Sequence, residues 1–390
     1  MSLIPNAVVE RKWRQAAARL DRGTLRFTAP NGEVTVFRGA KPGPDADFAI
    51  RDWAVMQMAV ARGDIGLGEA YIDAMWESGD IEALFKLFLL NMDGFDDLAN
   101  GSPLQRIGFV LVNTLLRRNS PKGSARNIQA HYDVGNAFYA LWLDPSMTYS
   151  SALYADGNAD LTDAQRSKYD RILSRLRGKQ SSVLELGCGW GGFAERASDA
   201  AHRVTGVTVS PSQQRFAAAR LSGRDCELRL QDYRDVRGTF DNIVSIEMFE
   251  AVGERYWPGY FHTIAERLRR GGRAVIQTIT IRDDLFAGYR RRSDFIRHYV
   301  FPGGMLPSLA RFTEEADRAG LKVAGAFAFG QDYARTLRDW SARMAAAQDA
   351  IAALGHDARF LRNWQFYLAM CAAAFSVGRT DVVQVELAHG

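Results

Sequence analysis

The sequence has 390 residues, of which 47% are hydrophobic and 24% are charged, so it is long enough for one large or two ordinary domains with a sizeable core. Its 49 basic and 45 acidic side chains give a net charge of +4, too balanced to indicate nucleic-acid binding, although a local basic surface toward anionic lipid is allowed. Cys188, Cys226 and Cys371 are too widely spaced for a disulfide framework or a metal site, which indicates a reducing compartment and no bound metal.

The beginning of the chain lacks the hydrophobic region of a signal peptide, and no apolar run approaches the ~18 residues that a membrane span needs. Any membrane role would therefore be peripheral. We expect a cytoplasmic protein that associates with the inner face of the membrane.

Residues 1–120 are expected to form a small mixed α+β domain. Alternating strands at 25–28 and 34–37 flank an Asn-Gly turn, which is a good hairpin signal. Apolar residues at helical spacing within 67–75 predict a short helix, and 81–91 predicts a second.

The end of this region, residues 104–118, is apolar and is followed by a basic cluster (Arg117, Arg118, Lys122 and Arg126). Such a pattern is typical of a helix that lies on a membrane surface. It is equally typical of a domain-linking helix with solvated basic residues at its C-terminal end. The segment Ser-Pro-Lys-Gly-Ser at 120–124 predicts the boundary with a second domain that covers 121–390.

The second domain is organised around residues 183–193, V-L-E-L-G-C-G-W-G-G-F, in which a short apolar strand enters a glycine-rich turn before a helix. Gly187, Gly189 and Gly191 let the backbone turn sharply and let a ligand approach it closely. The turn lacks the Lys-Ser/Thr of a phosphate-binding P-loop and the spacing of a nicotinamide site. Glu185, at the end of the strand, can meet a ribose or a cationic amino group. The motif E-x-G-x-G-x-G resembles motif I of S-adenosylmethionine (SAM) methyltransferases.

Six further strands are predicted after this turn, at 204–209, 228–230, 240–246, 274–281, 321–327 and 382–387. Together with the strand at 183–186 they imply an α/β fold with the Rossmann-like seven-stranded sheet of class I SAM methyltransferases. Residues 282–319 interrupt the alternation of strands and helices, and we interpret them as an inserted helical cover.

Ordered motifs over residues 131–390 resemble the cyclopropane fatty acid synthase family, which includes the mycolic acid cyclopropane synthases. They are H-Y-D-V-G-N at 131–136, D-P-S-M-T-Y-S-S at 144–151, G-V-T-V-S-x-x-Q at 206–213 and Y-x-F-P-x-G-x-L-P-S at 299–308. The resemblance implies SAM-dependent methyl(ene) transfer to the cis double bond of an unsaturated phospholipid acyl chain, which gives a cyclopropane ring. It implies that the insertion at 282–319 borders the acyl chain. The implied cofactor-binding residues are Tyr132, Tyr149, Ser150, Glu185, Gly187, Gly189, Gly191, Thr208, Gln213, Asp232 and Tyr233.

The family resemblance also implies a base that removes a proton from the transferred methyl group, namely a bound bicarbonate held by a glutamate, a histidine, a tyrosine and groups near a cysteine. Glu250 matches the glutamate and Tyr333 the tyrosine, whereas Gln277 and Ser151 stand where many members have histidine and cysteine. Glutamine and serine keep hydrogen-bonding groups, but glutamine cannot become cationic.

Cys371 matches a cysteine traditionally labelled as the active-site thiol of the family. Its apolar helix offers no neighbouring His or Lys to form a thiolate, so a buried small hydrophobic role suits it better.

Three interpretations stay open at this point. The first is cyclopropanation. In the second, which Gln277 and Ser151 favour, a different proton is lost and the product is a methyl-branched or methyl-unsaturated chain. The third, a non-catalytic lipid-binding module, is opposed by the intact Glu185, glycine turn and Glu250. The implied partner is an unsaturated membrane phospholipid and not a nucleic acid, and a homodimer is left open.

Overall fold

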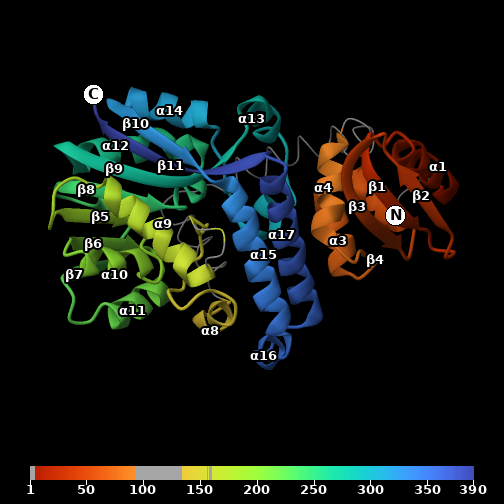
Figure 1. Cartoon of the computed structure of the whole chain (residues 1–390), viewed down its shortest axis with the longest axis horizontal. Helices are drawn as coiled ribbons and strands as arrows, with labels where there is room; N and C mark the ends of the chain where they lie inside the picture. Colours follow the sequence, from red (N-terminus) through yellow and green to blue (C-terminus); the bar gives the residue numbers. More distant parts are fainter. Residues whose placement is uncertain (1–4, 93–133, 156, 158–159) are drawn as a thin grey trace. The chain divides into compact units, whose positions relative to one another are not determined.

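The computed structural model describes residues 5–92, 134–155, 157 and 160–390, which divide into two compact units (Figure 1). The first unit contains the described part of residues 1–116 together with 291–300 and 348–379. The second contains the described part of 117–290 together with 301–347 and 380–390. The predicted helix at 104–118 and the boundary at 120–124 lie outside the described residues. The assignment of 1–120 as a domain stays a prediction, and it did not anticipate the two later segments of the first unit.

The first unit contains a four-stranded sheet in the order β2-β1-β3-β4. Its strands are β1 (Arg22–Thr28), β2 (Val34–Arg38), β3 (Lys41–Ile50) and β4 (Trp76–Glu77). The predicted hairpin is present, because β1 and β2 pair antiparallel with Thr28 opposite Val34. Its turn is closed by the side chain of Asn31, which accepts a hydrogen bond from the backbone N–H of Glu33 at 3.0 Å.

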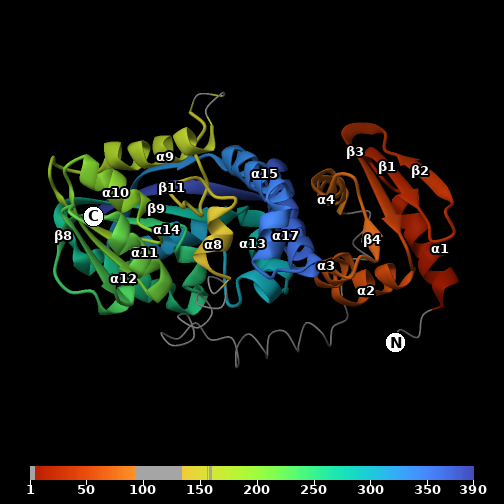
Figure 2. The ribbon, with the colours of Figure 1, turned by 90° about the horizontal axis from the view of Figure 1, so that it is seen from below.

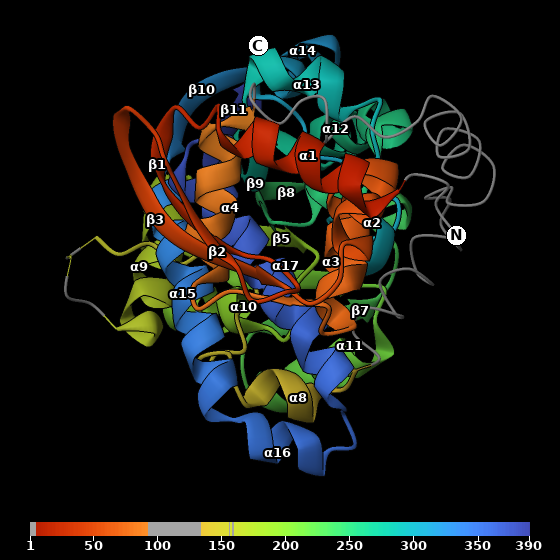
Figure 3. The same ribbon diagram turned by 90° about the vertical axis from the view of Figure 1, so that its right-hand side faces the viewer.

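Figure 3 shows this sheet in red, and α4 beside it is one of the helices of the first unit. They are α1 (Asn6–Ala17), α2 (Ala54–Arg62), α3 (Asp64–Ile72), α4 (Ile81–Leu90), α16 (Gln348–Ala353), α17 (Ala358–Ser376) and the π-helical turn η4 (Ile296–Val300). Trp13 of α1 packs against Phe27 and Phe48 with ring centroids 5.4 and 5.7 Å apart, so the sheet and α1 share an aromatic core. The helix predicted at 67–75 ends at Ile72 because Ala74 adopts a left-handed backbone with φ +54°.

The second unit is built on a seven-stranded sheet in the order β10-β11-β9-β8-β5-β6-β7. The strands are β5 (Ser182–Leu186), β6 (Arg203–Thr208), β7 (Cys226–Leu230), β8 (Phe240–Ile246), β9 (Leu268–Ile281), β10 (Leu321–Ala328) and β11 (Thr380–His389). Strands β5 to β9 pair parallel, whereas β11 runs antiparallel to both β9 and β10. All seven strands predicted from the sequence are present.

The helices of the second unit cover both faces of this sheet (Figure 2). They are α8 (Asn136–Ala140), α9 (Leu161–Arg175), α10 (Gly192–Asp199), α11 (Pro211–Arg220), α12 (Trp257–Arg267), α13 (Asp283–Tyr289), α14 (Leu309–Arg318) and α15 (Gly330–Ala346). Alternate residues of a strand point to opposite faces. Val183 accordingly packs with Tyr169 of α9 and Phe193 of α10, whereas Leu184 belongs to the core that contains Trp257 of α12.

The predicted cover at 282–319 forms α13, the π-helical turn η4 and α14. Phe312 of α14 is fully buried and packs against Phe249 and Phe261 with ring centroids 5.4 and 4.9 Å apart. Helix α14 is therefore part of the main core, while residues 291–300 belong to the first unit. The role of this segment in binding an acyl chain stays a prediction. Among the described helices, none combines the length and the apolar character that crossing a membrane requires.

Candidate active site

The glycine turn after β5 has the geometry of a ligand cradle. Gly187, Gly189 and Gly191 have φ values of +79°, +51° and +85°, which side chains rarely tolerate. A Cβ at Gly187 would come within 2.8 Å of Met248, so that glycine is required by packing. A Cβ at Gly189 would meet no atom of the described chain within 4 Å, so that glycine keeps the backbone approachable from outside.

Glu185, the acid before this turn, is a buried carboxylate with an unsatisfied oxygen. The residue is 3% exposed, and its Oε2 has no hydrogen-bond partner among the described residues. Burial raises its pKa to about 8, which the positive charge of Lys168 partly opposes. Because buried polar atoms are normally paired, the orphaned oxygen indicates a place for donors of a ligand. The cradle and this carboxylate fit SAM, whose ribose hydroxyls and amino group are such donors.

Lys168 of α9 is a functional candidate that the sequence analysis did not single out. It is fully buried, and its Nζ donates to Ser150 Oγ at 2.7 Å. Burial lowers its pKa to about 7, against the opposing charges of Glu247, Asp144 and Glu185. A lysine three residues after Gln165 on a mostly polar helix gives no sequence signal of burial.

The remaining predicted cofactor residues lie after β6 and β7. Thr208 donates to the side-chain oxygen of Gln213 at 3.0 Å, and both residues are buried. Asp232 forms an ion pair with Arg234 at 2.7 Å, and burial raises the pKa of Tyr233 to about 12. Tyr132 lies outside the described residues.

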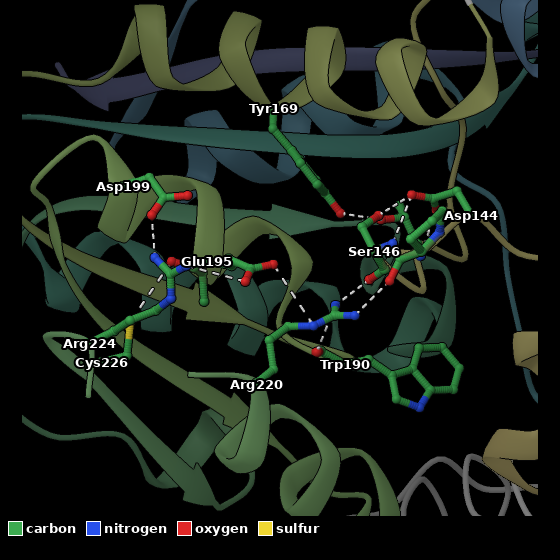
Figure 4. Close-up of polar contacts among 12 residues, drawn as sticks. Asp144, Ser146, Tyr169, Trp190, Glu195, Asp199, Arg220, Arg224 and Cys226 are labelled. Atoms are coloured by element: carbon green, nitrogen blue, oxygen red, sulfur yellow. Dashed lines mark hydrogen bonds and ion pairs between the residues drawn. The ribbon is translucent and has the colours of Figure 1, made fainter. Parts of the chain in front are cut away.

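Arg220 of α11 forms hydrogen bonds both to the segment that carries Tyr149 and Ser150 and to the glycine turn (Figure 4). The guanidinium donates to the carbonyl oxygens of Pro145 at 2.8 Å, Ser146 and Trp190, the last at 3.2 Å. Because Trp190 directly follows Gly189, this one side chain links the two segments that border the cradle. Tyr149 itself packs against the ring of Trp340 with centroids 5.3 Å apart.

A second group of side chains converges on Glu247, immediately after β8. Glu247 Oε1 accepts hydrogen bonds from the backbone N–H of Ser151 and from Gln277 Nε2, both at 2.8 Å. Its Oε2 accepts from the hydroxyl of Tyr333 of α15 at 2.7 Å. Removal from water raises the pKa of Glu247, whereas the three donors and the charge of Lys168 lower it. The residue as a whole is partly exposed, although its carboxylate is held among these donors.

Glu250 is held by β9, and its predicted catalytic role stays a prediction. Its Oε1 accepts from Thr278 Oγ1 at 3.0 Å and from the backbone N–H of Ile279, so the side chain is fastened to β9. Burial and the negative charge of Glu247 raise its pKa to about 8. Ser151, Gln277 and Tyr333 thus share the carboxylate of Glu247, not that of Glu250. The signal was present in the E-M-F-E segment at 247–250, where two carboxylates follow one strand.

The residues around Glu247 do not fit a bound bicarbonate. Two predicted side-chain ligands, Gln277 and Tyr333, and the backbone N–H of Ser151 already bind a carboxylate that belongs to the chain. The negative charge of Glu247 would also disfavour a further anion beside it.

Cys371, the remaining predicted catalytic residue, lies in α17 and belongs to the first unit. Burial raises the pKa of its thiol, so it carries no thiolate near neutral pH. The predicted catalytic role of Cys371 stays a prediction.

Comparison with known proteins identifies the family to which this geometry belongs. The family model for mycolic acid cyclopropane synthetase matches residues 119–385. The chain belongs to this family. Tuberculostearic acid methyltransferase UfaA1 of Mycobacterium tuberculosis is 35% identical over 98% of this chain and 91% of its own length. Cyclopropane-fatty-acyl-phospholipid synthase of Escherichia coli is 34% identical over 88% of each chain.

Two solved structures of cyclopropane synthases share the fold of about two thirds of this chain. The cyclopropane synthase MmaA2 of M. tuberculosis matches with a TM-score of 0.64 and 28% identity, over 68% of this chain and 98% of its own. Mycolic acid cyclopropane synthase CmaA1, in complex with SAH and CTAB, matches with a TM-score of 0.64 and 31% identity, over 67% and 97%. The predicted class I SAM methyltransferase fold is confirmed, and this family member is a SAM-dependent methyltransferase.

Proposed function

We propose that this enzyme transfers a methyl group from SAM to the cis double bond of an unsaturated acyl chain in a membrane phospholipid, and that Glu247 is the base that completes the reaction. The observation that carries the proposal is the convergence of Ser151, Gln277 and Tyr333 on the Glu247 carboxylate. The similarity to lipid-modifying relatives supports the substrate class. The enzyme would meet this substrate as a peripheral protein on the cytoplasmic face of the membrane.

The chain supplies binding groups around a cofactor that brings its own activated carbon. SAM supplies a methyl group on a sulfonium, which leaves behind a neutral thioether. Glu185 would accept hydrogen bonds from the cofactor, and the open backbone at Gly189 would let it approach. The carboxylate of Glu247 also favours a cationic cofactor over its neutral product, which assists exchange.

The hydrogen bonds of Glu247 determine which oxygen takes the proton. Oε1 is bonded to two N–H groups, which can only donate. Oε2 is bonded to the Tyr333 hydroxyl, which can rotate and accept a hydrogen bond from a protonated carboxyl. A proton is therefore accommodated on Oε2 without breaking the group of donors around Oε1.

The chemical step balances with this single base. One alkene carbon forms a bond to the methyl carbon, while the sulfur keeps the electron pair of the broken S–C bond. The acyl chain then carries a positive charge. When Oε2 removes a proton from the new methyl group, the released C–H electron pair forms the second C–C bond of the cyclopropane ring.

A second product uses the same residues. If the positive charge first moves to the methylated carbon by a hydride shift, loss of a methyl proton to Glu247 leaves a methylene branch instead of a ring. The relative that covers 98% of this chain is named a tuberculostearic acid methyltransferase, which favours this outcome as the alternative.

Purified enzyme, SAM and vesicles of a mono-unsaturated phospholipid test the proposal. We expect each turnover to add one CH₂ to an acyl chain, and proton NMR of the product to show ring protons. Exomethylene protons would assign the second product. Glu247→Gln should bind SAM normally and lose about 10²–10⁴-fold in turnover, since it cannot take a proton. Undiminished turnover by that variant would remove Glu247 from its role.

A further inference from the structure

Two fully buried glutamines lie directly opposite each other beside the proposed base. Gln277 of β9 pairs with Gln384 of β11, and neither side chain is exposed. Gln384 Nε2 donates to Gln277 Oε1 at 3.0 Å. Buried amides are costly unless their hydrogen-bonding groups are paired in the correct sense, so this pair has one functional orientation.

Arg171 of α9 sets that orientation from one end. Its guanidinium donates to Gln384 Oε1 at 2.6 Å, and arginine has no acceptor. Gln384 must therefore turn its carbonyl oxygen to Arg171 and its amide nitrogen to Gln277. Gln277 is then left with its own amide nitrogen toward Glu247, to which it donates at 2.8 Å. The carboxylate of Glu247, at the other end of this chain of hydrogen bonds, can only accept, so it requires the same orientation of both amides.

We infer that Arg171 is a positioning residue for the reaction, which acts on Glu247 through Gln384 and Gln277. This inference rests on the proposed role of Glu247 as the base. A cation at the start of a hydrogen-bonded chain also polarises the links that follow it. Without Arg171, only the carboxylate of Glu247 sets the orientation of the two amides, and a molecule in which Gln277 flips would present its carbonyl oxygen to that carboxylate.

The functional consequence concerns the charge of Glu247. The hydrogen bond from Gln277 favours the ionised carboxylate, which is the form that removes a proton. Loss of Arg171 should therefore raise the pKa of Glu247 and lower the fraction of active enzyme at a given pH. The cofactor-binding groups at Glu185 and Gly189 are not part of this chain of hydrogen bonds.

The test compares Arg171→Met with Arg175→Met in the full-length enzyme. Both residues lie on α9, but Arg175 is exposed and its Nε is 3.7 Å from Glu386, outside the hydrogen-bonded chain. Methionine keeps apolar contact with Phe327, whose ring Arg171 covers at 4.0 Å. With unsaturated phospholipid vesicles, we expect Arg171→Met to lower kcat about 10–100-fold at pH 7 and to move the acidic limb of the kcat–pH profile upward, with KM for SAM unchanged. Arg175→Met should match the parent.

Two further variants distinguish positioning from a general loss of stability. Gln384→Met breaks the same chain at its middle, so the double variant with Arg171→Met should be no slower than the slower single variant. Arg171→Lys, which restores a donor-only cation, should recover part of the rate. Multiplying effects in the double variant, or a parental pH profile in Arg171→Met, would overturn the inference.

The same experiments separate this inference from the proposed function. If Glu247→Gln turns over like the parent, the proposed base is wrong. If Glu247→Gln is inactive while Arg171→Met keeps the parental kcat and pH profile, only the role of Arg171 is wrong.

Discussion

Tyr333 of α15 donates its hydroxyl proton to Glu247 Oε2 at 2.7 Å, which joins a helix that follows β10 to the end of β8. Replacement of Tyr333 by Phe removes a hydrogen bond to a charged group, which is typically worth about 1.5–3 kcal/mol. We therefore expect kcat to fall on the order of 10–100-fold and the acidic limb of its pH profile to move upward. Steady-state rates from pH 5 to 9 measure both effects.

A matched control for this substitution is available in the same unit. Tyr154 also donates its hydroxyl to a carboxylate, that of Asp339, at 2.6 Å. Tyr154→Phe should leave the pH profile in place. Equal changes in both variants would mean that the Tyr333 hydroxyl has no specific role.

A second prediction concerns bicarbonate. Because the carboxylate of Glu247 already binds the donors, removal of dissolved carbon dioxide and bicarbonate should leave the turnover of the parent enzyme unchanged. Glu247→Gly relieves the left-handed backbone at this residue, φ +49°, and removes the carboxylate that accepts hydrogen bonds from Ser151, Gln277 and Tyr333. This variant should be inactive in bicarbonate-free buffer and should regain activity as bicarbonate or formate is added. A parent enzyme that slows on bicarbonate removal would contradict the assignment.

A third prediction separates cofactor binding from folding at the glycine turn. Gly189→Ala places a methyl group where the chain offers no contact, so it should weaken SAM binding at least about 10-fold, or ~1.4 kcal/mol. Gly223 also has a positive φ, +79°, with no protein atom near its Cβ position. It lies before the start of β7, however, whereas Gly189 lies after the end of β5. Gly223→Ala therefore carries the same kind of backbone strain without the cofactor. Isothermal titration with SAM and thermal melts of both variants give the comparison, and equal SAM affinities would exclude Gly189 from the cofactor site.

A fourth prediction follows from the raised pKa of Glu185. Its folded-state pKa of about 8 lies above the ordinary 4.5, so the folded protein binds more protons than the unfolded chain between these values. The contribution of Glu185 to stability is fully present below pH 4.5 and is lost as the pH rises through 8. Glu185→Gln has no ionisable carboxyl at this position and therefore avoids this loss of stability. Without SAM, the Tm of the variant minus the Tm of the parent should increase from pH 5 to pH 8.5.

The control for Glu185 is the exposed Glu227, whose pKa is lowered by its hydrogen bond to Arg229. Glu227→Gln should show no such advantage at high pH. If the Tm difference between Glu185→Gln and the parent does not vary with pH, burial does not raise the pKa of Glu185 in solution.

The sheet of the second unit could be predicted because its signals are local. Each strand is a short apolar run, and the glycines after Glu185 mark the turn where β5 gives way to α10. The division into units could not be predicted, because residues 291–300 and 348–379 join the first unit through contacts with residues distant in sequence. Periodicity reports which face of a helix is buried, but not against which part of the chain.

The sequence predicted the residues around the candidate site but not the carboxylate on which their hydrogen bonds converge. Family motifs supplied Ser151, Gln277 and Tyr333, but two glutamates three residues apart are indistinguishable by motif. The left-handed backbone of Glu247 decides between them, since it turns this side chain toward the donors while Glu250 is fastened to β9. Arg171 and Gln384 were missed because they meet across more than two hundred positions of sequence, where no pattern connects them.

The opposed pair of buried glutamines has a consequence for how this enzyme diverges from its relatives. Gln277 Oε1 accepts from the amide nitrogen of Gln384, so replacing Gln277 by a residue without an acceptor would leave Gln384 with an unmatched N–H in the interior. Because the chain from Arg171 through Gln384 to Gln277 draws on α9, β11 and β9, a chimera whose β9 brings no acceptor to position 277 should lose activity before it loses its fold.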